Sequence, residues 1–135
     1  MELPCPMCTS FLDAVEGNAR QIAERVALVV AARSPYPRMA AFAAARGWRS
    51  LRLVSAAGSE FSSDFLAEDR SGGQNPILYV FQRKDGEVRL TWASEVLFAP
   101  SDPGQDARHL DLLWPLWGIL DLTPAGRGPD WYPKL

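Results

Sequence analysis

The sequence predicts an α/β fold, a single-domain sandwich in which helices cover both faces of a mixed β-sheet. Stretches with helical and with strand-like hydrophobic spacing alternate along the chain, which is typical of α/β proteins. A tight turn at residues 84–86 separates two strand-like stretches, and strands joined so closely must be antiparallel. The 135 residues, 47% of them hydrophobic, suffice for one core but not for two domains.

The first half of the chain predicts two helices and two strands in alternation. Residues 9–24 place apolar side chains on one stripe and charged ones on the other, as in an amphipathic helix. Residues 26–32 form an unbroken apolar run, which indicates a strand covered on both faces. A second helix begins near residues 34–37 and ends at Gly47, a residue that suits a left-handed backbone. Residues 51–54 are typical of a short strand.

The middle of the chain predicts an irregular surface segment followed by a hairpin. Residues 55–75 are rich in Gly, Ser and Asp, with isolated aromatic residues, and we expect no regular element there. Residues 77–82 and 87–93 are the two expected strands, because the second alternates apolar and polar side chains. Lys84-Asp85-Gly86 is the turn that joins them.

The last third predicts one more helix and a tail. Residues 100–104 are expected to be a loop, and residues 110–122 to be a helix with Pro115 in its first turn or at a kink. Residues 123–135 are rich in Pro and Gly, so we expect an irregular C-terminal tail held by Trp131. The whole chain, 1–135, is thus one domain.

Charge and hydropathy exclude several classes of partner. A net charge of −2 lacks the basic character of nucleic-acid-binding domains. The longest clean apolar run, residues 26–32, is too short for a membrane span, so we expect no membrane partner. The first four residues carry no signal-peptide pattern, which favours a cytoplasmic protein.

The strongest chemical signal is the pair Cys5 and Cys8, in Cys5-Pro6-Met7-Cys8, because the chain has no other cysteine. In a reducing compartment this spacing indicates redox chemistry or metal binding rather than a structural disulfide. Cys5 stands just ahead of a helix, whose free N–H groups and dipole lower the pKa of a thiol. We therefore expect Cys5 to be the catalytic nucleophile and Cys8 the resolving thiol.

Zinc is the less favoured reading of the pair. A structural zinc site needs four ligands, and this chain offers two cysteines and one distant histidine, His109, which we expect at the surface near a helix start. Only two such motifs meeting across a twofold axis could complete the site. We therefore predict no metal and no bound cofactor.

A Cys-Pro-x-Cys at a helix start, followed by a βαβ pattern, resembles the thioredoxin-like proteins, and residues 75–81 are similar to the segment where these folds place a cis-proline facing the cysteines. By that resemblance Pro76 is cis and presents its backbone to a substrate disulfide. More narrowly, the chain resembles the bacterial domain-of-unknown-function 899 family, which implies a thioredoxin-like fold but no established activity. The residues that carry this resemblance are Cys5-Pro6-Met7-Cys8-Thr9-Ser10-Phe11, Gly47-Trp48, Ser55-Ala56-Ala57-Gly58, Phe98-Ala99-Pro100 and Leu120-Asp121-Leu122-Thr123-Pro124.

The chain departs from this pattern at its start. Thioredoxin-like folds carry a central strand before the cysteine helix, and four residues before Cys5 are too few for one. Residues 26–32 must then pair directly with residues 77–82, or a second chain must supply the strand, because unpaired buried edges are costly. We therefore expect a homodimer.

The leading expectation for function is a thiol–disulfide oxidoreductase, with Cys5, Cys8 and Pro76 as its site and a protein or small-molecule disulfide as its substrate. A thiol peroxidase is a variant that needs a nearby arginine, for which Arg33 and Arg127 are the candidates. The alternative from another class is a non-catalytic dimeric binding or assembly domain. The tryptophans at 48, 92, 114 and 117 are expected in the core or an interface, and the face that the last two share is the best candidate for a partner surface.

Overall fold

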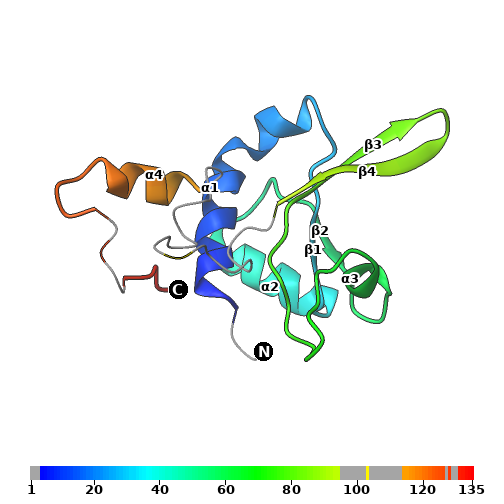
Figure 1. Cartoon of the computed structure of the whole chain (residues 1–135), viewed down its shortest axis with the longest axis horizontal. Helices are drawn as coiled ribbons and strands as arrows, with labels where there is room; N and C mark the ends of the chain where they lie inside the picture. The colour runs from blue at the N-terminus through cyan, green and yellow to red at the C-terminus, as the bar shows by residue number, and fades with distance from the viewer. Residues whose placement is uncertain (1–3, 95–102, 104–113, 127, 129–130) are drawn as a thin grey trace.

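A computed structural model describes residues 4–94, 103, 114–126, 128 and 131–135, and it confirms a mixed α/β fold. Figure 1 shows α1 at the centre, with α4 on one side and the strands on the other. In chain order the elements are α1 (Pro6–Ala23), β1 (Val30–Ala32), α2 (Tyr36–Arg46), β2 (Leu53–Ser55), α3 (Phe61–Asp64), β3 (Tyr79–Lys84), β4 (Glu87–Ala93) and α4 (Pro115–Asp121).

The first two strands form a parallel pair through a crossover helix. β1 pairs with β2 from Val30↔Leu53 onwards, and α2 connects them and packs on β2. The predicted strand at 26–32 is therefore shorter than expected, and it is not covered on both faces. Val26 is 57% exposed and Val29 42%. The apolar run is longer than the strand because only the last three residues find a partner strand.

Helix α2 ends as the sequence predicts. Gly47 has φ +78°, in the left-handed region, and its N–H donates to the carbonyls of Ala43 and Ala44. Glycine reaches this conformation without the steric penalty that a Cβ would bring. The chain then turns into residues 48–52, which carry it back to β2.

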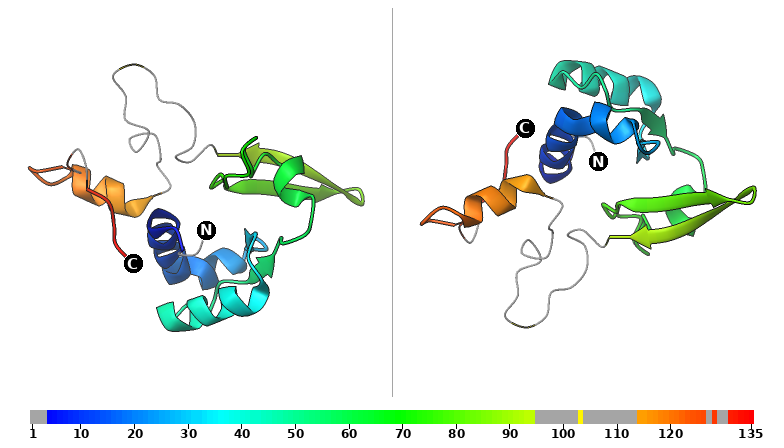
Figure 2. Two further views of the ribbon diagram at one scale, coloured as in Figure 1. Left: turned by 90° about the horizontal axis from the view of Figure 1, so that it is seen from below. Right: turned by 90° about the horizontal axis from the view of Figure 1, so that it is seen from above.

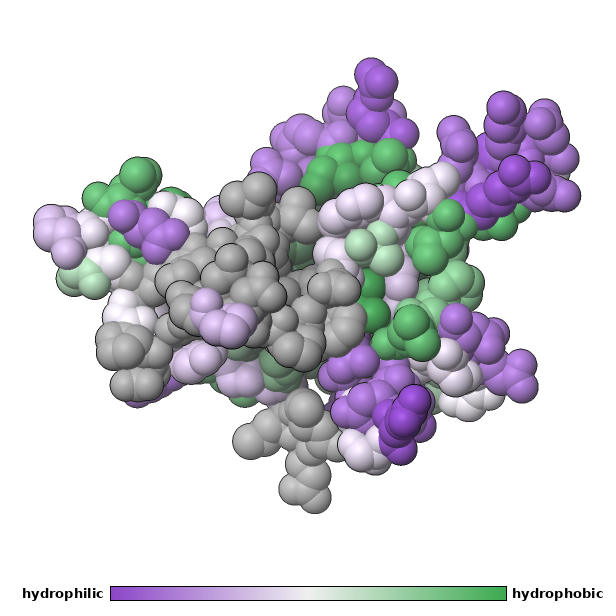
Figure 3. All heavy atoms as spheres, viewed as in Figure 1, coloured by the Kyte–Doolittle hydropathy of each residue, from purple (hydrophilic) through white to green (hydrophobic). Residues whose placement is uncertain are grey.

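The hairpin is confirmed, and its turn has the geometry that sequence predicts. β3 and β4 are antiparallel, with Lys84 opposite Glu87, and φ is +52° at Asp85 and +82° at Gly86. Two successive positive φ values are characteristic of a type I′ turn, whose twist matches that of the strands. Apolar residues lie exposed along this hairpin, and its tip is hydrophilic (Figure 3).

A short helix replaces part of the irregular segment expected at 55–75. α3 brings Phe61 and Phe65 onto one face of the hairpin, where the rings of Phe65 and Phe81 are 5.2 Å apart and those of Phe61 and Tyr79 are 5.9 Å apart. The isolated aromatic residues of this segment are thus packing residues.

The single mixed sheet that the sequence predicts is not present among the described residues. They form two separate two-stranded sheets, β1–β2 and β3–β4, and residues 26–32 do not pair with residues 77–82. The hairpin closes a loop of two residues, whereas pairing β1 with β3 would close a loop of nearly fifty, at a higher cost in chain entropy. Each of these strands has a partner strand at one edge only among the described residues.

The fourth helix packs against the first through tryptophan. The rings of Phe11 and Trp114 lie 5.3 Å apart, and Trp114 and Trp117 are 2% and 0% exposed. The face shared by these two tryptophans is therefore core, and its expected role as a partner surface is wrong. Pro115 lies in the first turn of α4, as predicted, where its missing N–H costs nothing.

The C-terminal segment returns to the beginning of the chain. Trp131 packs edge-on against Trp117 at 6.0 Å, so it holds the tail as expected. Residues 131–135 lie beside the first turn of α1 in all three ribbon views (Figures 1 and 2). No helix in the described part of the chain is both long and apolar enough to cross a bilayer.

Candidate functional site

The two cysteines lie at the beginning of α1, where the helix has free N–H groups. Cys5 is the N-cap residue, with φ −69° and ψ +119°, and Pro6 follows at a position where proline is tolerated. Cys8 is inside the first turn, so the spacing of three residues places both side chains on one side of it. The helix begins at Pro6, earlier than the periodicity of residues 9–24 indicates.

The sulfurs are in contact, and both are half-buried. The Cys8 thiol donates a hydrogen bond to Cys5 Sγ at 2.6 Å, and the Cys8 backbone N–H donates to the same sulfur at 3.2 Å. Both cysteines are free thiols in this structure. The sequence predicts that the helix end activates Cys5; here the Cys8 thiol is a further donor to Cys5 Sγ.

These contacts separate the pKa values of the two thiols. The hydrogen bond from the Cys8 thiol lowers the pKa of Cys5 to about 6, against burial, which raises it, and the N–H groups of Cys8 and Met7 lower it further. The pKa of Cys8 is raised because its proton is held by Cys5 and because the group is buried beside a negative charge. Cys5 is thus the thiolate near neutral pH, and Cys8 remains protonated.

Helix α1 is anchored on the α2–β2 unit by two carboxylates. Asp13 accepts a hydrogen bond from the Trp48 indole N–H at 2.7 Å and forms an ion pair with Arg46. One turn later, Glu16 accepts from the backbone N–H groups of residues 49, 50 and 51 at 2.8, 2.9 and 3.0 Å. Although burial raises it, these N–H groups lower the pKa of Glu16 below its ordinary value.

Sequence reasoning missed these anchors. It placed Asp13 and Glu16 on the solvent face of an amphipathic helix, and their partners lie 33 to 35 residues away along the chain. An acidic residue that accepts from three N–H groups of a distant loop is not marked by any local pattern in the sequence. The nearest signal is Trp48, a tryptophan just after the glycine that ends α2, whose N–H requires an acceptor when it is buried.

Pro76 does not have the geometry that was predicted for it. The described residues contain no cis peptide bond, so the Asn75–Pro76 bond is trans. Asn75 is held by the loop after α3, since its backbone N–H donates to the carbonyl of Ala67 and its side chain to that of Leu66. The cis-proline expectation is therefore wrong: it rested on a resemblance alone, and trans is the ordinary state of a bond before proline.

The other candidates from the sequence lie elsewhere or outside the described residues. Arg33 forms an ion pair with Glu68 at 2.5 Å, which ties the end of β1 to the loop after α3. Arg127 and His109 fall outside the described part of the chain. Within that part, no group of three or more His, Cys, Asp or Glu side chains is placed to hold a metal ion.

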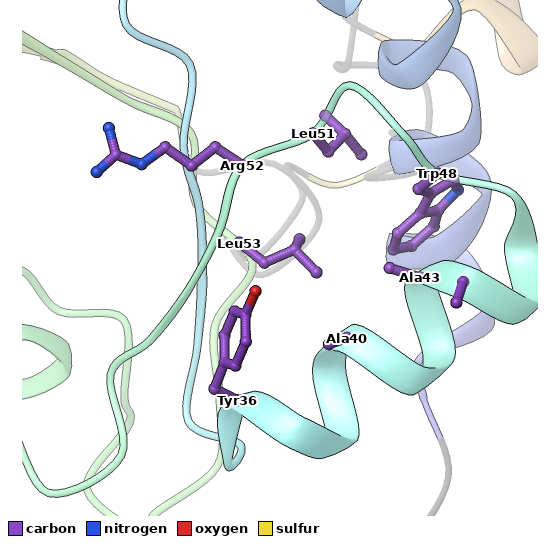
Figure 4. A pocket seen from close by; sticks show the side chains of 8 residues that line it. Tyr36, Ala40, Ala43, Trp48, Leu51, Arg52 and Leu53 are labelled. Carbon is purple, nitrogen blue, oxygen red and sulfur yellow. The ribbon is translucent and has the colours of Figure 1, made fainter.

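A shallow hollow lies between α2 and β2, and the residues that line it fall between positions 36 and 53. It has a volume of about 430 Å³ and is lined mostly by apolar side chains, among them Trp48 and Leu53. Figure 4 shows the Tyr36 ring beside Leu53, and the guanidinium of Arg52 extending away from the hollow. Neither cysteine lines it, so the thiol pair remains the candidate site.

The fold and the site together define a mixed α/β domain with a vicinal thiol pair at a helix N-terminus. The chain belongs to a family of bacterial proteins of unknown function, DUF899, whose family model matches residues 1–135. The resemblance seen in the sequence is thereby confirmed at the level of the family. No curated protein and no solved structure matches this chain.

Proposed function

We propose that this protein is a thioredoxin-like thiol–disulfide oxidoreductase in which Cys5 is the nucleophile and Cys8 the resolving thiol. One observation carries the proposal, namely that Cys5 Sγ is the side-chain acceptor at the N-cap and receives hydrogen bonds from both the thiol and the N–H of Cys8. A thiolate is the reactive form of cysteine, and this environment favours it.

The reaction proceeds by two exchanges. The Cys5 thiolate attacks one sulfur of the substrate disulfide, the S–S bond breaks, and the released thiolate takes a proton from solvent. Cys8 then loses its proton to solvent and attacks Cys5 Sγ in the mixed disulfide, which releases the second substrate sulfur as a thiol. The protein ends with a Cys5–Cys8 disulfide, two electrons have passed to the substrate, and an external thiol returns the protein to its reduced form.

The pKa values suit this order of steps. The charge on Cys5 is one reason that the pKa of Cys8 is raised. Once Cys5 is bound in a mixed disulfide, that charge is gone and Cys8 ionises more readily. The two sulfurs are already in contact, so Cys8 needs little movement to attack. The role requires no bound cofactor and suits a reducing compartment such as the cytoplasm. The proposal does not depend on Pro76.

The test is alkylation of the reduced protein with iodoacetamide across pH 4 to 10, together with turnover of hydroxyethyl disulfide in the presence of glutathione. We expect Cys5 to titrate near 6, Cys5→Ser to abolish turnover, and Cys8→Ser to accumulate a mixed disulfide detectable by mass spectrometry. A Cys5 pKa at the ordinary value of 9.0 together with no turnover would contradict the proposal.

A second candidate function, assembly as a homodimer, is favoured by the hairpin. Val80 and Trp92 lie opposite each other on β3 and β4, on the face of the hairpin turned away from Phe65, and they are 46% and 47% exposed. A two-stranded hairpin with apolar side chains in water is marginally stable by itself. We propose that a second copy covers this surface. Light scattering should then give twice 14.9 kDa, and Trp92→Lys should halve that mass. A mass of one chain at all concentrations would contradict it. Cys5→Ser should leave the mass unchanged, which separates the two functions.

A further inference from the structure

The backbone carbonyl of Cys5, and not only its sulfur, has a specific partner. Thr9 donates two hydrogen bonds to it, one from its backbone N–H and one from its side-chain Oγ1, each at 2.9 Å. The first is the ordinary bond of an α-helix. The second is an addition that a side chain without a hydroxyl could not make. Thr9 therefore binds the backbone of the residue whose sulfur is the proposed nucleophile.

The surroundings of Thr9 make this second bond effective. Thr9 is 4% exposed, one of few polar residues buried in the described part of the chain, so water has little access to compete for the carbonyl. The hydroxyl follows Cys8 directly in sequence, and it spans the same turn that the thiol hydrogen bonds span. One turn of helix thus carries three side-chain contacts between residue 5 and residues 8 and 9.

The carbonyl controls where the sulfur lies. Cys5 is outside the helix proper, with ψ +119°, and its side chain faces the Cys8 N–H only in that conformation. Pro6 has no N–H of its own, so it adds no hydrogen bond to the first turn. A turn at the end of a helix frays when it is held by few bonds, and fraying would carry Cys5 Sγ away from its donors.

We propose that Thr9 is a positioning residue for the thiol pair: its buried hydroxyl holds the Cys5 carbonyl and thereby keeps Cys5 Sγ within hydrogen-bonding distance of Cys8. The catalytic meaning of this inference rests on the proposed oxidoreductase function. The positioning itself is independent of turnover, because it is visible in the reactivity of Cys5 toward a small alkylating agent.

The groups that set the charge on Cys5 are few, which makes the readout specific. The Cys8 thiol and the N–H groups of Cys8 and Met7 favour the thiolate, and burial opposes it. No charged side chain from another element of the described chain contributes. A change in the Cys5 titration after substitution of Thr9 therefore reports the geometry of this turn.

The experiment compares four side chains at position 9 by the rate of Cys5 alkylation between pH 4 and 10. Thr9→Val removes the hydroxyl and keeps the shape, Thr9→Ser keeps the hydroxyl and removes the methyl group, and Thr9→Ala removes both. Thr123→Val is the matched control, since the Thr123 hydroxyl also donates to a backbone carbonyl, that of Leu120 at 2.7 Å, but at the end of α4.

If the hydroxyl positions the turn, wild type and Thr9→Ser react alike, and Thr9→Val and Thr9→Ala react about threefold more slowly at pH 6. One net hydrogen bond carries a change of about fivefold in the ionisation equilibrium, which lowers the thiolate from about one-half to about one-sixth of Cys5 at that pH. At pH 10, where Cys5 is ionised in every variant, all four should converge. Thr123→Val should match wild type throughout. Circular dichroism tests whether each variant is folded. If Thr9→Val does not fold, Thr9→Ala supplies the comparison without the hydroxyl.

Two results would overturn the inference. If wild type and Thr9→Val react alike while Thr9→Ser and Thr9→Ala are both slow, the methyl group matters through packing and the hydroxyl does not. If all four titrate together at a low pKa, Thr9 has no role in positioning, although the oxidoreductase proposal stands. A wild-type Cys5 that titrates as an ordinary thiol would instead contradict that proposal.

Discussion

Replacing Cys8 with alanine tests the central electrostatic argument. The largest cause that lowers the pKa of Cys5 from 9.0 to about 6 is the hydrogen bond from the Cys8 thiol. Cys8→Ala removes this donor and leaves the backbone N–H groups of Met7 and Cys8 in place. We therefore expect the pKa of Cys5 to rise to about 8, still below that of a free thiol because two donors remain.

The magnitude follows from the two ionisation states. With a pKa of about 6, roughly nine-tenths of Cys5 is thiolate at pH 7, whereas with a pKa of about 8 roughly one-tenth is. The rate of alkylation at pH 7 should therefore fall about tenfold in Cys8→Ala. At pH 10 the two proteins should differ little, since Cys5 is then almost fully ionised in both.

The assay follows loss of free thiol with iodoacetamide at a series of pH values, and mass spectrometry assigns the modified residue. Cys8→Ser is the matched control, because its hydroxyl keeps a donor at the same position and should give a curve between the other two. If Cys8→Ala titrates at the pKa of the wild type, the thiol hydrogen bond is not what activates Cys5, and the helix terminus alone would have to account for it.

Three further predictions concern the frame that holds the site. Glu16→Gln should lower the free energy of unfolding by about 1–2 kcal/mol at pH 7. Because the pKa of Glu16 in the folded protein lies below its ordinary 4.5, its contribution is complete above pH 4.5 and is lost as pH falls through the folded pKa. Thermal melts of the two proteins should therefore converge in acid, and a gap that persists there would contradict the anchor. Trp117→Ala should cost about 3–5 kcal/mol in chemical denaturation, whereas Trp92→Ala, at a half-exposed site, should cost far less, and equal costs would contradict the packing of α4. Gly47→Ala should destabilise the protein by about 1 kcal/mol, and the cost comes from its φ of +78° alone because no atom would obstruct the new Cβ. Gly118→Ala within α4 should stabilise the protein by a similar amount in the same melts. Two changes of one sign would refute the reasoning.

The thiol site was largely predictable because its contacts are local. The spacing of Cys5 and Cys8 and the proline between them place both at the first turn of a helix, and the contact between the two sulfurs is made within that turn. The hairpin was predictable for the same reason, since Asp85 and Gly86 specify its turn. In each case residues close together in sequence determine the geometry.

The remainder depends on contacts that the sequence does not encode locally. The strand expected at 26–32 had the right composition, but its length depends on how much of β2 lies beside it. Glu16 and its three N–H partners meet only because α2 returns the chain to α1. The cis form of Pro76 was expected from a resemblance alone, and the bond before Pro76 is trans.

The return of residues 131–135 to the first turn of α1 has a practical consequence for anyone who handles the protein (Figure 2). An affinity handle or fluorescent label joined after Leu135 would lie near the first turn of α1, where both cysteines are. The turn at Asp85-Gly86 projects from the opposite side of the molecule, so a short peptide inserted there would leave the approach to the sulfurs open.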